Sequence, residues 1–532
     1  MLEQPSQVDL LLVGGRLVDG SGAQAREGTV GVLENRLHLG DSAWRPAAGR
    51  TIDASRMVVA PGFIDLHSHG GLVVLADPRH EPKVRQGVTT EVIGVDGNGY
   101  APFAHRDDLA AFVELNAGLD GRPPIDFDWD TVASYIGRYD RQALNIVVLI
   151  GNSALRIGAI GWDDEPADER TLANMRAMLR EGMAEGAFGL SSGLDYPPGS
   201  FASTDELAAL TQEAAAHGGF YHTHVRYPLG DRFLDPFREA VEIGRRGEGP
   251  VHITHFYHRR TYPGGPEEML GLVDDARQAG MDVTFDSYPY EWASTRLLIQ
   301  LPQWVQAGGP IALKERLADG TVRERIRAEL RSRSATFTSP AGWADVRLGA
   351  FTLPDLVRWE SHTLADYMAE TDSDPVDAIC DLLLAENLGV AQVTSGPWSE
   401  TLPHFVRHAV GMIGTDSTFL GDKPSPRTYG SFPRILGQFV RDEQLLSLEE
   451  AVRKMTGAPA ARLRLKDRGL LRDGYAADLV VFDPARIRSN ATYDEPRRYP
   501  DGIEYVVVNG EPVVDAGRHT GALPGRALSS GR

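Results

Sequence analysis

Eight short apolar runs recur along the middle of the chain, and each is followed by polar residues. Amphipathic segments of helical character separate them, for example 168–185 and 204–217. Strands that are buried on both faces of a parallel sheet have this near-continuous apolar character. We therefore predict an α/β fold with a (β/α)8 (TIM) barrel, whose strands are residues 63–66, 90–94, 145–150, 188–191, 219–224, 251–255, 282–285 and 411–415.

The two ends of the chain have a different pattern, in which short strands alternate with glycine- or asparagine-containing turns. Residues 477–483 and 503–514 continue at the C-terminus the pattern that fills the first part of the chain. Neither part has enough strands to bury a core by itself. We predict one small β-sandwich domain made of residues 1–60 plus 466–532, and a catalytic barrel of residues 61–465.

The interval between the seventh and eighth predicted strands is long enough to hold a further unit. It contains a charged helical segment, Pro310–Ser332. We predict an inserted helical segment at about 296–345 on the catalytic face of the barrel, where it is a candidate lid. The alternative is a peripheral decoration that makes no contact with substrate.

Composition excludes several classes of partner. The net charge of −20 and a pI near 5.2 argue against nucleic acid or an anionic membrane as a partner, because either would require a basic face. The single cysteine, Cys380, cannot form an intramolecular disulfide, which fits a reducing compartment. Met1–Gly15 lacks a basic leader, and no run approaches the roughly 18 apolar residues of a membrane helix. We expect a cytoplasmic protein.

Residues that can bind a metal stand at five of the predicted strand ends, where barrel enzymes place their active sites. His67 and His69 share one strand face, since side chains alternate along a strand. Imidazole nitrogens suit zinc, a carboxylate such as Asp96 can bridge two ions, and Asp416 can take a proton from water that a metal has made acidic. We predict one or two Zn²⁺ ions, Asp416 as catalytic base, and the ligands His67, His69, Asp96, His224, His255 and Asp416.

Three neighbouring residues have simpler interpretations. His222 lies one layer deeper than His224 and is expected to pack or to support a ligand. His252 precedes His255 by three residues, so we expect it on the opposite strand face, against the helices. Arg226 follows His224 by two residues and is a candidate substrate-binding residue, because its guanidinium could bind an anion. The alternative is that it forms an ion pair with a carboxylate at the rim of the barrel.

Five longer segments are more particular than the metal pattern: Pro61–His69, Gly189–Gly199, Thr223–Arg226, Asp286–Tyr290 and Pro426–Arg434. With them the chain resembles, over essentially its whole length, the amidohydrolase superfamily and more narrowly the N-acyl-D-amino-acid deacylases (D-aminoacylases). The resemblance implies metal ligands at the four strand-end histidines and Asp416 as general base. It also implies substrate contacts from Tyr196, from a tyrosine of Tyr288–Tyr290, for which we take Tyr288, and from Arg427, whose guanidinium can grip a carboxylate.

The chain departs from the pattern of that family at three places. Asp96 stands where the family has a cysteine ligand, which favours a binuclear site because carboxylates bridge ions readily. Phe256-Tyr257 replaces a His-Lys pair whose lysine helps to bind the substrate carboxylate. Tyr257 therefore becomes a candidate substrate-binding residue, and the need for a free carboxylate is left open. Gly151-Asn-Ser replaces Gly-His-Gly.

The resemblance implies a zinc-dependent hydrolase of C–N bonds other than peptide bonds, which cleaves N-acyl-D-amino acids to a carboxylic acid and a D-amino acid. Water activated at the metal would attack the amide carbonyl, so the partner is a small acylated amino acid or amine. Three alternatives remain: an amidase for amides without a free carboxylate, a scaffold barrel without catalysis, and a cyclic-amide hydrolase, whose usual strand-four lysine is missing from Gly186–Ser192. The oligomeric state stays open, a homo-oligomer included.

Overall fold

The computed structural model of the chain describes residues 4–227, 233–332 and 342–530. A barrel of parallel strands forms its centre, as the sequence predicts. Six strands are hydrogen-bonded in the order β17-β13-β12-β11-β10-β9 and three in the order β6-β7-β8. Their bounds are β6 (Phe63–Asp65), β7 (Val88–Ile93), β8 (Asn145–Val148), β9 (Ile150–Gly151), β10 (Gly189–Gly193), β11 (Phe220–His224), β12 (Val251–Ile253), β13 (Val283–Ser287) and β17 (Gly411–Ile413).

Hydrogen bonds between the two groups of strands close the barrel. On one side, β8 and β9 are consecutive pieces of one barrel strand, and Leu149 N donates to Ile93 O. On the other side, Asp416 N donates to His67 O at 2.8 Å, and Ser68 bridges to Ser417. The second seam of the barrel therefore runs through two residues of the predicted metal site.

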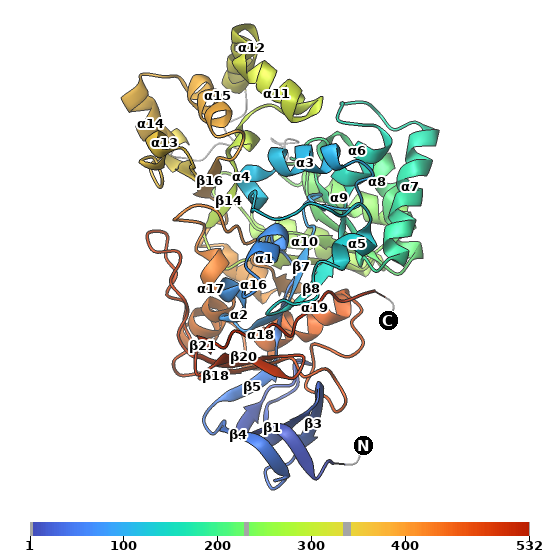
Figure 1. Cartoon of the computed structure of the whole chain (residues 1–532), viewed down its shortest axis with the longest axis vertical. Helices are drawn as coiled ribbons and strands as arrows, with labels where there is room; N and C mark the ends of the chain where they lie inside the picture. The colour runs from blue at the N-terminus through green and yellow to red at the C-terminus, as the bar shows by residue number, and fades with distance from the viewer. Residues whose placement is uncertain (1–3, 228–232, 333–341, 531–532) are drawn as a thin grey trace.

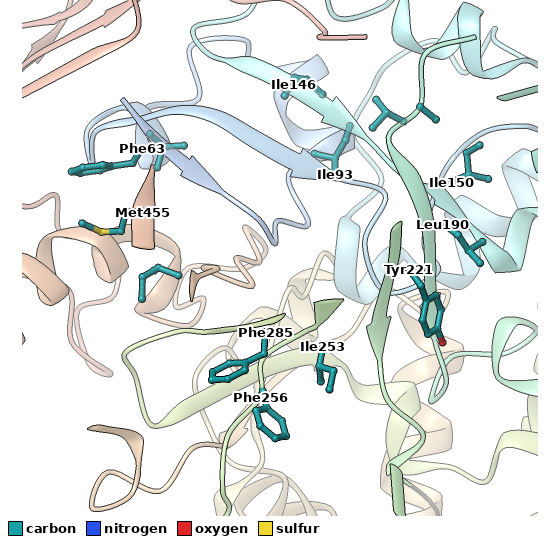
Figure 2. Close-up of a cluster of buried hydrophobic side chains, with 14 of the residues drawn as sticks. Phe63, Ile93, Ile146, Ile150, Leu190, Tyr221, Ile253, Phe256, Phe285 and Met455 are labelled. Carbon is teal, nitrogen blue, oxygen red and sulfur yellow. The ribbon is translucent and has the colours of Figure 1, made fainter. Parts of the chain in front are cut away.

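Alternate residues of the barrel strands enter two different apolar clusters. Phe63, Ile93 and Ile146 belong to the large core outside the strands, to which several other barrel strands also contribute a side chain (Figure 2). Their neighbours Ile64 and Val92 belong to a separate cluster, because successive side chains point to opposite faces. Strands that are apolar on both faces explain the continuous runs in the sequence.

Helices follow the strands and cover the outside of the barrel (Figure 1). Polar caps begin two of them: Asp168 accepts from Thr171 N ahead of α7, and Ser203 from Glu206 N ahead of α8. Among the described residues, none of the helices has both the length and the apolar character needed to cross a bilayer. The helices are α1 (Gly71–Ala76), α2 (Glu81–Val84), α3 (Arg106–Leu115), α4 (Ala117–Asp120), α5 (Val132–Ile136), α6 (Asn152–Ala159), α7 (Glu169–Ala184), α8 (Thr204–Ala216), α9 (Asp235–Gly247), α10 (Pro266–Gln278), α16 (Leu402–Arg407), α17 (Arg427–Arg434), a π-helix (Ile435–Asp442), α18 (Leu448–Met455) and α19 (Gly457–Arg462).

Both ends of the chain contribute to one nine-stranded sheet, which forms the small β-domain at one end of the molecule (Figure 1). The sheet order is β21-β20-β19-β18-β5-β1-β2-β3, with β4 beside β1. β5 joins the two halves, because it is parallel to β1 and antiparallel to β18. The bounds are β1 (Gln7–Leu17), β2 (Arg26–Leu33), β3 (Arg36–Gly40), β4 (Ala47–Asp53), β5 (Val58–Pro61), β18 (Leu479–Phe482), β19 (Ile503–Val508), β20 (Glu511–Asp515) and β21 (Arg518–His519).

A separate unit fills the interval between β13 and β17 and lies at the opposite end of the molecule from the nine-stranded sheet (Figure 1). It has its own apolar core, and residues 333–341 of the predicted insertion lie outside the described residues. Since β14 pairs with β16, the unit extends beyond the predicted segment to Ser395. Its elements are β14 (Trp292–Arg296), α11 (Gly309–Ala318), α12 (Gly320–Ser332), β15 (Arg347–Gly349), α13 (Pro354–Val357), α14 (Leu364–Thr371), α15 (Pro375–Ala385) and β16 (Ala391–Ser395).

Candidate metal centre

The six predicted metal ligands lie together, buried, at the carboxyl ends of the barrel strands. They form two overlapping groups, and within each group the candidate ligand atoms lie within 4.8 Å of one another. Asp96 belongs to both groups, so one carboxylate connects the whole centre. The groups are His67, His69, Asp96 and Asp416, and Asp96, His224 and His255.

One oxygen of Asp96 faces ring nitrogens from four histidines. Oδ2 lies 3.3 Å from His67 Nε2 and 3.5 Å from His69 Nε2. The same oxygen lies 3.6 Å from His224 Nδ1 and 3.9 Å from His255 Nε2. A carboxylate placed between two sets of imidazoles is suited to bridge two cations.

Unusual backbone conformations direct three of these side chains into the site. Asp96, His255 and Asp416 have φ angles of +54°, +34° and +47°, and each follows closely on a barrel strand. L-residues rarely adopt positive φ, and such a conformation costs on the order of 1–3 kcal/mol. Gly94 and Gly97, with φ of +73° and +71°, flank Asp96 and allow the turn that carries it.

Two carboxylates that the sequence did not single out orient the histidines. His69 Nδ1 donates to Asp120 Oδ1 at 2.9 Å, and His224 Nε2 donates to Asp195 Oδ2 at 3.0 Å. In each case the hydrogen bond leaves the other ring nitrogen directed at Asp96. Asp195 precedes Tyr196 within one of the segments that carry the family resemblance, whereas no sequence signal marks Asp120, which ends α4.

His252 lies inside the barrel, and the prediction that it faces the helices is wrong. Its Nε2 is 2.9 Å from Asp286 Oδ2, and its ring stacks on His222 with centroids 5.3 Å apart. The prediction assumed that strand alternation continues to His255. β12 ends at Ile253 and His255 has a positive φ, so the alternation stops between the two histidines. Asp286 also lies 3.8 Å from His67 Nδ1 and accepts a hydrogen bond from His255 N. Its position directly after the seventh predicted strand could have indicated that it belongs to the site.

The carboxylates change the pKa values of the histidines. Burial opposes protonation of His67, yet Asp96 and Asp416 raise its pKa to about 10. Burial also opposes protonation of His69 and His224, but Asp120 raises the pKa of His69 well above its usual value, and Asp195 with Asp96 raises that of His224 to about 9. Burial and the neighbouring positive charge lower the pKa of His255 to about 3. At neutral pH the imidazoles of His67, His69 and His224 in the metal-free site are therefore protonated, whereas that of His255 is not.

The donor set fits a metal site. Among the described residues, neither ring nitrogen of His67 has a hydrogen-bond partner, and Asp96 Oδ1 has none either, although all three atoms are buried. His255 Nε2 lies 2.9 Å from His224 Nδ1, so two ring nitrogens converge on one position. Buried polar atoms without partners are costly, and imidazole and carboxylate donors in this number suit zinc.

Asp416 lies between the histidines and a buried arginine. Its Oδ1 is 3.3 Å from His69 Nε2, and its Oδ2 is 2.8 Å from Arg427 NH1. Burial would raise the pKa of Asp416, but the charges of Arg427 and His67 lower it to about 2. Asp416 is therefore a carboxylate at neutral pH and can accept a proton.

Four predicted substrate-binding residues border the centre. The Tyr196 ring lies 4.9 Å from the His224 ring, and its Oη is 2.9 Å from Thr295 Oγ1 of β14. Tyr257 and Tyr288 lie in one aromatic cluster, and the guanidinium carbon of Arg427 lies 4.4 Å from the Tyr288 ring centroid.

Arg226 does not belong with them. Its Nε donates to Glu239 Oε2 at 3.0 Å, and NH2 and NH1 donate to the carbonyl oxygens of Ala202 and Ser200. The guanidinium is thus engaged on all three nitrogens within the protein. The structure replaces the prediction of a substrate-binding Arg226 with the alternative of an ion pair.

Buried histidines and aspartates lie at the ends of the first, second, fifth, sixth and eighth strands of a (β/α)8 barrel. This arrangement defines a class of barrel proteins with a metal centre. Within that class, the model of the amidohydrolase family matches residues 50–379 and 397–514. The chain belongs to the amidohydrolase family, and the resemblance drawn from its sequence is confirmed.

Individual relatives match along nearly their whole length. A D-aminoacylase of Alcaligenes xylosoxydans xylosoxydans is 34% identical over 526 residues, which cover 98% of this chain and 97% of that protein. The N-acyl-D-glutamate deacylase of Bordetella bronchiseptica, solved with zinc and a phosphonate mimic of the tetrahedral intermediate, superposes with a TM-score of 0.82 at 29% identity, covering 98% of this chain and 100% of that one. A D-aminoacylase with a binuclear metal centre superposes with a TM-score of 0.81 at 31% identity and the same coverage.

Proposed function

We propose that the protein is a zinc-dependent amidohydrolase that hydrolyses N-acyl-D-amino acids to a carboxylic acid and a D-amino acid. The observation that carries the proposal is the position of Asp96 between two pairs of histidines, with Asp416 and Arg427 at the same centre. The full-length similarity to a D-aminoacylase and to an N-acyl-D-glutamate deacylase supports the same activity.

Two zinc positions would share Asp96. His67, His69, Asp96 and Asp416 would hold one ion, and Asp96, His224 and His255 the other. Zinc supplies Lewis acidity when bound, which polarises an amide carbonyl and lowers the pKa of water. In the D-aminoacylase with a binuclear centre, one metal activates and the second attenuates. We assign the weaker site here to the His67 and His69 side, as the family resemblance implies.

Asp416 and Arg427 would move and control the proton. The Asp416 carboxylate accepts a proton from the attacking water and donates it to the nitrogen of the leaving amine. Arg427, 2.8 Å away, keeps Asp416 ionised before the reaction. Arg427 Nε is buried and has no hydrogen-bond partner among the described residues, so this arginine retains a donor for a carboxylate of the substrate.

The proposal extends to the organisation of the chain and to its location. We propose a β-domain of residues 1–60 plus 466–532, which would contain β1–β4, β5 except for Pro61, and β18–β21, and a barrel of 61–465. The insertion would border the substrate, because Thr295 of β14 contacts Tyr196. A chain with Cys380 as its one cysteine suits the cytoplasm, because it needs no oxidising compartment.

A substrate screen tests the activity. The purified protein, with and without added zinc, is given N-acetyl-D-methionine, N-acetyl-L-methionine, N-acetyl-D-methioninamide and hydantoin. We expect hydrolysis of the D-acid, abolished by a chelator and restored by zinc. Hydrolysis of the amide but not of the acid would replace the deacylase with an amidase. Hydrolysis of hydantoin alone would replace it with a cyclic-amide hydrolase, which the absence of lysine from β10 disfavours.

A further inference from the structure

Arg259 is a cation near the metal centre that has no acidic partner in the described part of the chain. It follows His255 by four residues, in the segment after β12, and it is partly exposed. Its NH2 donates to Tyr257 Oη at 3.3 Å, whereas its buried Nε finds no acceptor among the described residues. Within the same residues, no carboxylate forms an ion pair with this guanidinium. Among the residues that the structure describes, no carboxylate therefore neutralises the positive charge of Arg259.

Two tyrosine rings hold the guanidinium next to a candidate metal ligand. The Arg259 guanidinium carbon lies 4.9 Å from the Tyr227 ring centroid and 5.5 Å from that of Tyr257. Such cation–π contacts position a cation and leave its charge in place. Tyr227 Oη is 3.2 Å from His255 Nδ1, and the Tyr257 ring lies 6.1 Å from the His255 ring. One aromatic side chain thus separates Arg259 from His255.

The same tyrosines connect Arg259 to the other cation of the site. The rings of Tyr257 and Tyr288 are 5.6 Å apart, and Arg427 packs on Tyr288. The Tyr288 hydroxyl is buried and has no hydrogen-bond partner among the described residues. Arg427 differs from Arg259 in having a carboxylate, Asp416, beside it. Within the described ranges, donors without partners therefore gather around the tyrosine pair, and the charge of Arg259 has no carboxylate beside it.

On the basis of the proposed function, we propose that Arg259 is a specificity-determining residue that binds a carboxylate of the substrate. A guanidinium offers paired N–H donors in a plane, which match the two oxygens of a carboxylate. Tyr257 then acts by holding Arg259, and a substrate without a carboxylate would leave this charge unpaired. Arg259 would then supply the positive charge that the lysine supplies in the family pattern, so the requirement for an anionic substrate would persist through a different residue. The carboxylate is either the one on the α-carbon or one on the side chain.

Two matched substrate pairs test this assignment and separate the two carboxylates. N-acetyl-D-methionine against its amide reports the α-carboxylate, and N-acetyl-D-glutamate against N-acetyl-D-glutamine reports the side-chain carboxylate. The variants are Arg259→Gln and Arg259→Lys, with Arg260→Gln as the control, since Arg260 is the exposed neighbour and loses the same charge. The measured quantity is the ratio of kcat/KM for the acid to that for its neutral partner.

We expect Arg259→Gln to lower this ratio about 10- to 100-fold in one pair, mainly through KM, because a hydrogen-bonded charge pair is lost. Arg259→Lys should restore part of the ratio, and Arg260→Gln should leave it unchanged. A fall in the methionine pair would assign Arg259 to the α-carboxylate, and a fall confined to the glutamate pair would assign it to the side chain. Unchanged ratios in both pairs, in a variant that folds and binds zinc as the parent does, would overturn the proposal.

Failure of the proposed function would look different, because the parent protein would then hydrolyse none of the four compounds. In that case the assignment of Arg259 is tested by calorimetry, which measures the binding of N-acetyl-D-methionine and N-acetyl-D-glutamate to the metal-free protein. Binding that Arg259→Gln weakens about 10-fold or more would support the assignment of Arg259. Equal binding to parent and variant, or no binding to either, would overturn it.

Discussion

Asp96 connects the two groups of candidate metal ligands, because it belongs to both of them. Its position after the second apolar run marked it as a strand-end carboxylate, and the structure brings it within 3.9 Å of four histidine nitrogens. Asp120 could not be predicted in this way. It reaches His69 from the end of α4, and its role depends on tertiary packing that no spacing in the sequence reports. Asp195 lay within a recognised segment but had no assigned role.

Asp120 and Asp195, which orient His69 and His224, are expected to contribute to zinc affinity. Asp120→Asn and Asp195→Asn should each lower zinc affinity about 10- to 100-fold, because an amide holds the imidazole tautomer less well than a carboxylate does. Asp195→Asn should weaken the site of His224, and Asp120→Asn the site of His69. Competition titration with a chromophoric chelator measures both binding events.

A suitable control for these variants is Asp274→Asn, since Asp274 also pairs with a histidine, His408, but outside the predicted metal site. This control should bind zinc as the parent does. Two unaltered binding events in both test variants would contradict the roles given to Asp120 and Asp195.

At the scale of elements, the strands could be predicted from periodicity, but the residues immediately after them could not. All eight barrel positions coincide with the apolar runs, since burial on both faces leaves a clear signal. His252 and His255 show where periodicity stops: the strand ends at Ile253, and the turn that follows changes which side chain faces the site. Positive φ at a non-glycine residue depends on tertiary contacts and is not visible in a hydrophobic pattern.

The turn after β7 gives a prediction for this scale. Gly94 has a φ of +73°, and a Cβ there would lie 2.3 Å from the carbonyl oxygen of Leu149. Gly94→Ala should therefore lower the free energy of unfolding of the metal-free protein by about 1–3 kcal/mol. It should also weaken zinc binding, because Asp96 follows two residues later. Urea unfolding monitored by circular dichroism measures the first effect.

The matched control is Gly271→Ala, in helix α10, where an added Cβ meets nothing within 4 Å. Alanine should leave the stability of that variant unchanged or raise it slightly, since glycine is unfavourable inside a helix. If Gly94→Ala unfolds at the same urea concentration as the parent, the turn is not constrained in the way described.

Over the whole molecule, the site joins segments from His67 to Asp416, so the metal ligands are held by the closed barrel and by no single element. The two β-rich ends could be predicted to form one small β-domain, because neither end could bury a core alone, and the structure joins them in one sheet. The extent of the insertion could not be predicted, because β14 pairs with β16 across a long stretch of ordinary composition. Long-range pairing of short antiparallel strands leaves little local signal.

Zinc binding must also be linked to pH. In the metal-free protein His67 and His224 have pKa values of about 10 and about 9, and that of His69 is also well above its usual value. At pH 7 these three imidazoles hold protons that zinc has to displace. Zinc affinity should therefore rise as the pH is raised from about 6 to about 8, and binding should release protons.

A titration of the metal-free protein with zinc, followed by calorimetry in buffers of different ionisation enthalpy and by hydrolysis of N-acetyl-D-methionine, tests this account most directly. We expect hydrolysis to appear as zinc binds, protons to be released, and the affinity to be higher at pH 8 than at pH 6. Full hydrolysis in the presence of a chelator, or the absence of stoichiometric zinc binding after reconstitution, would contradict it.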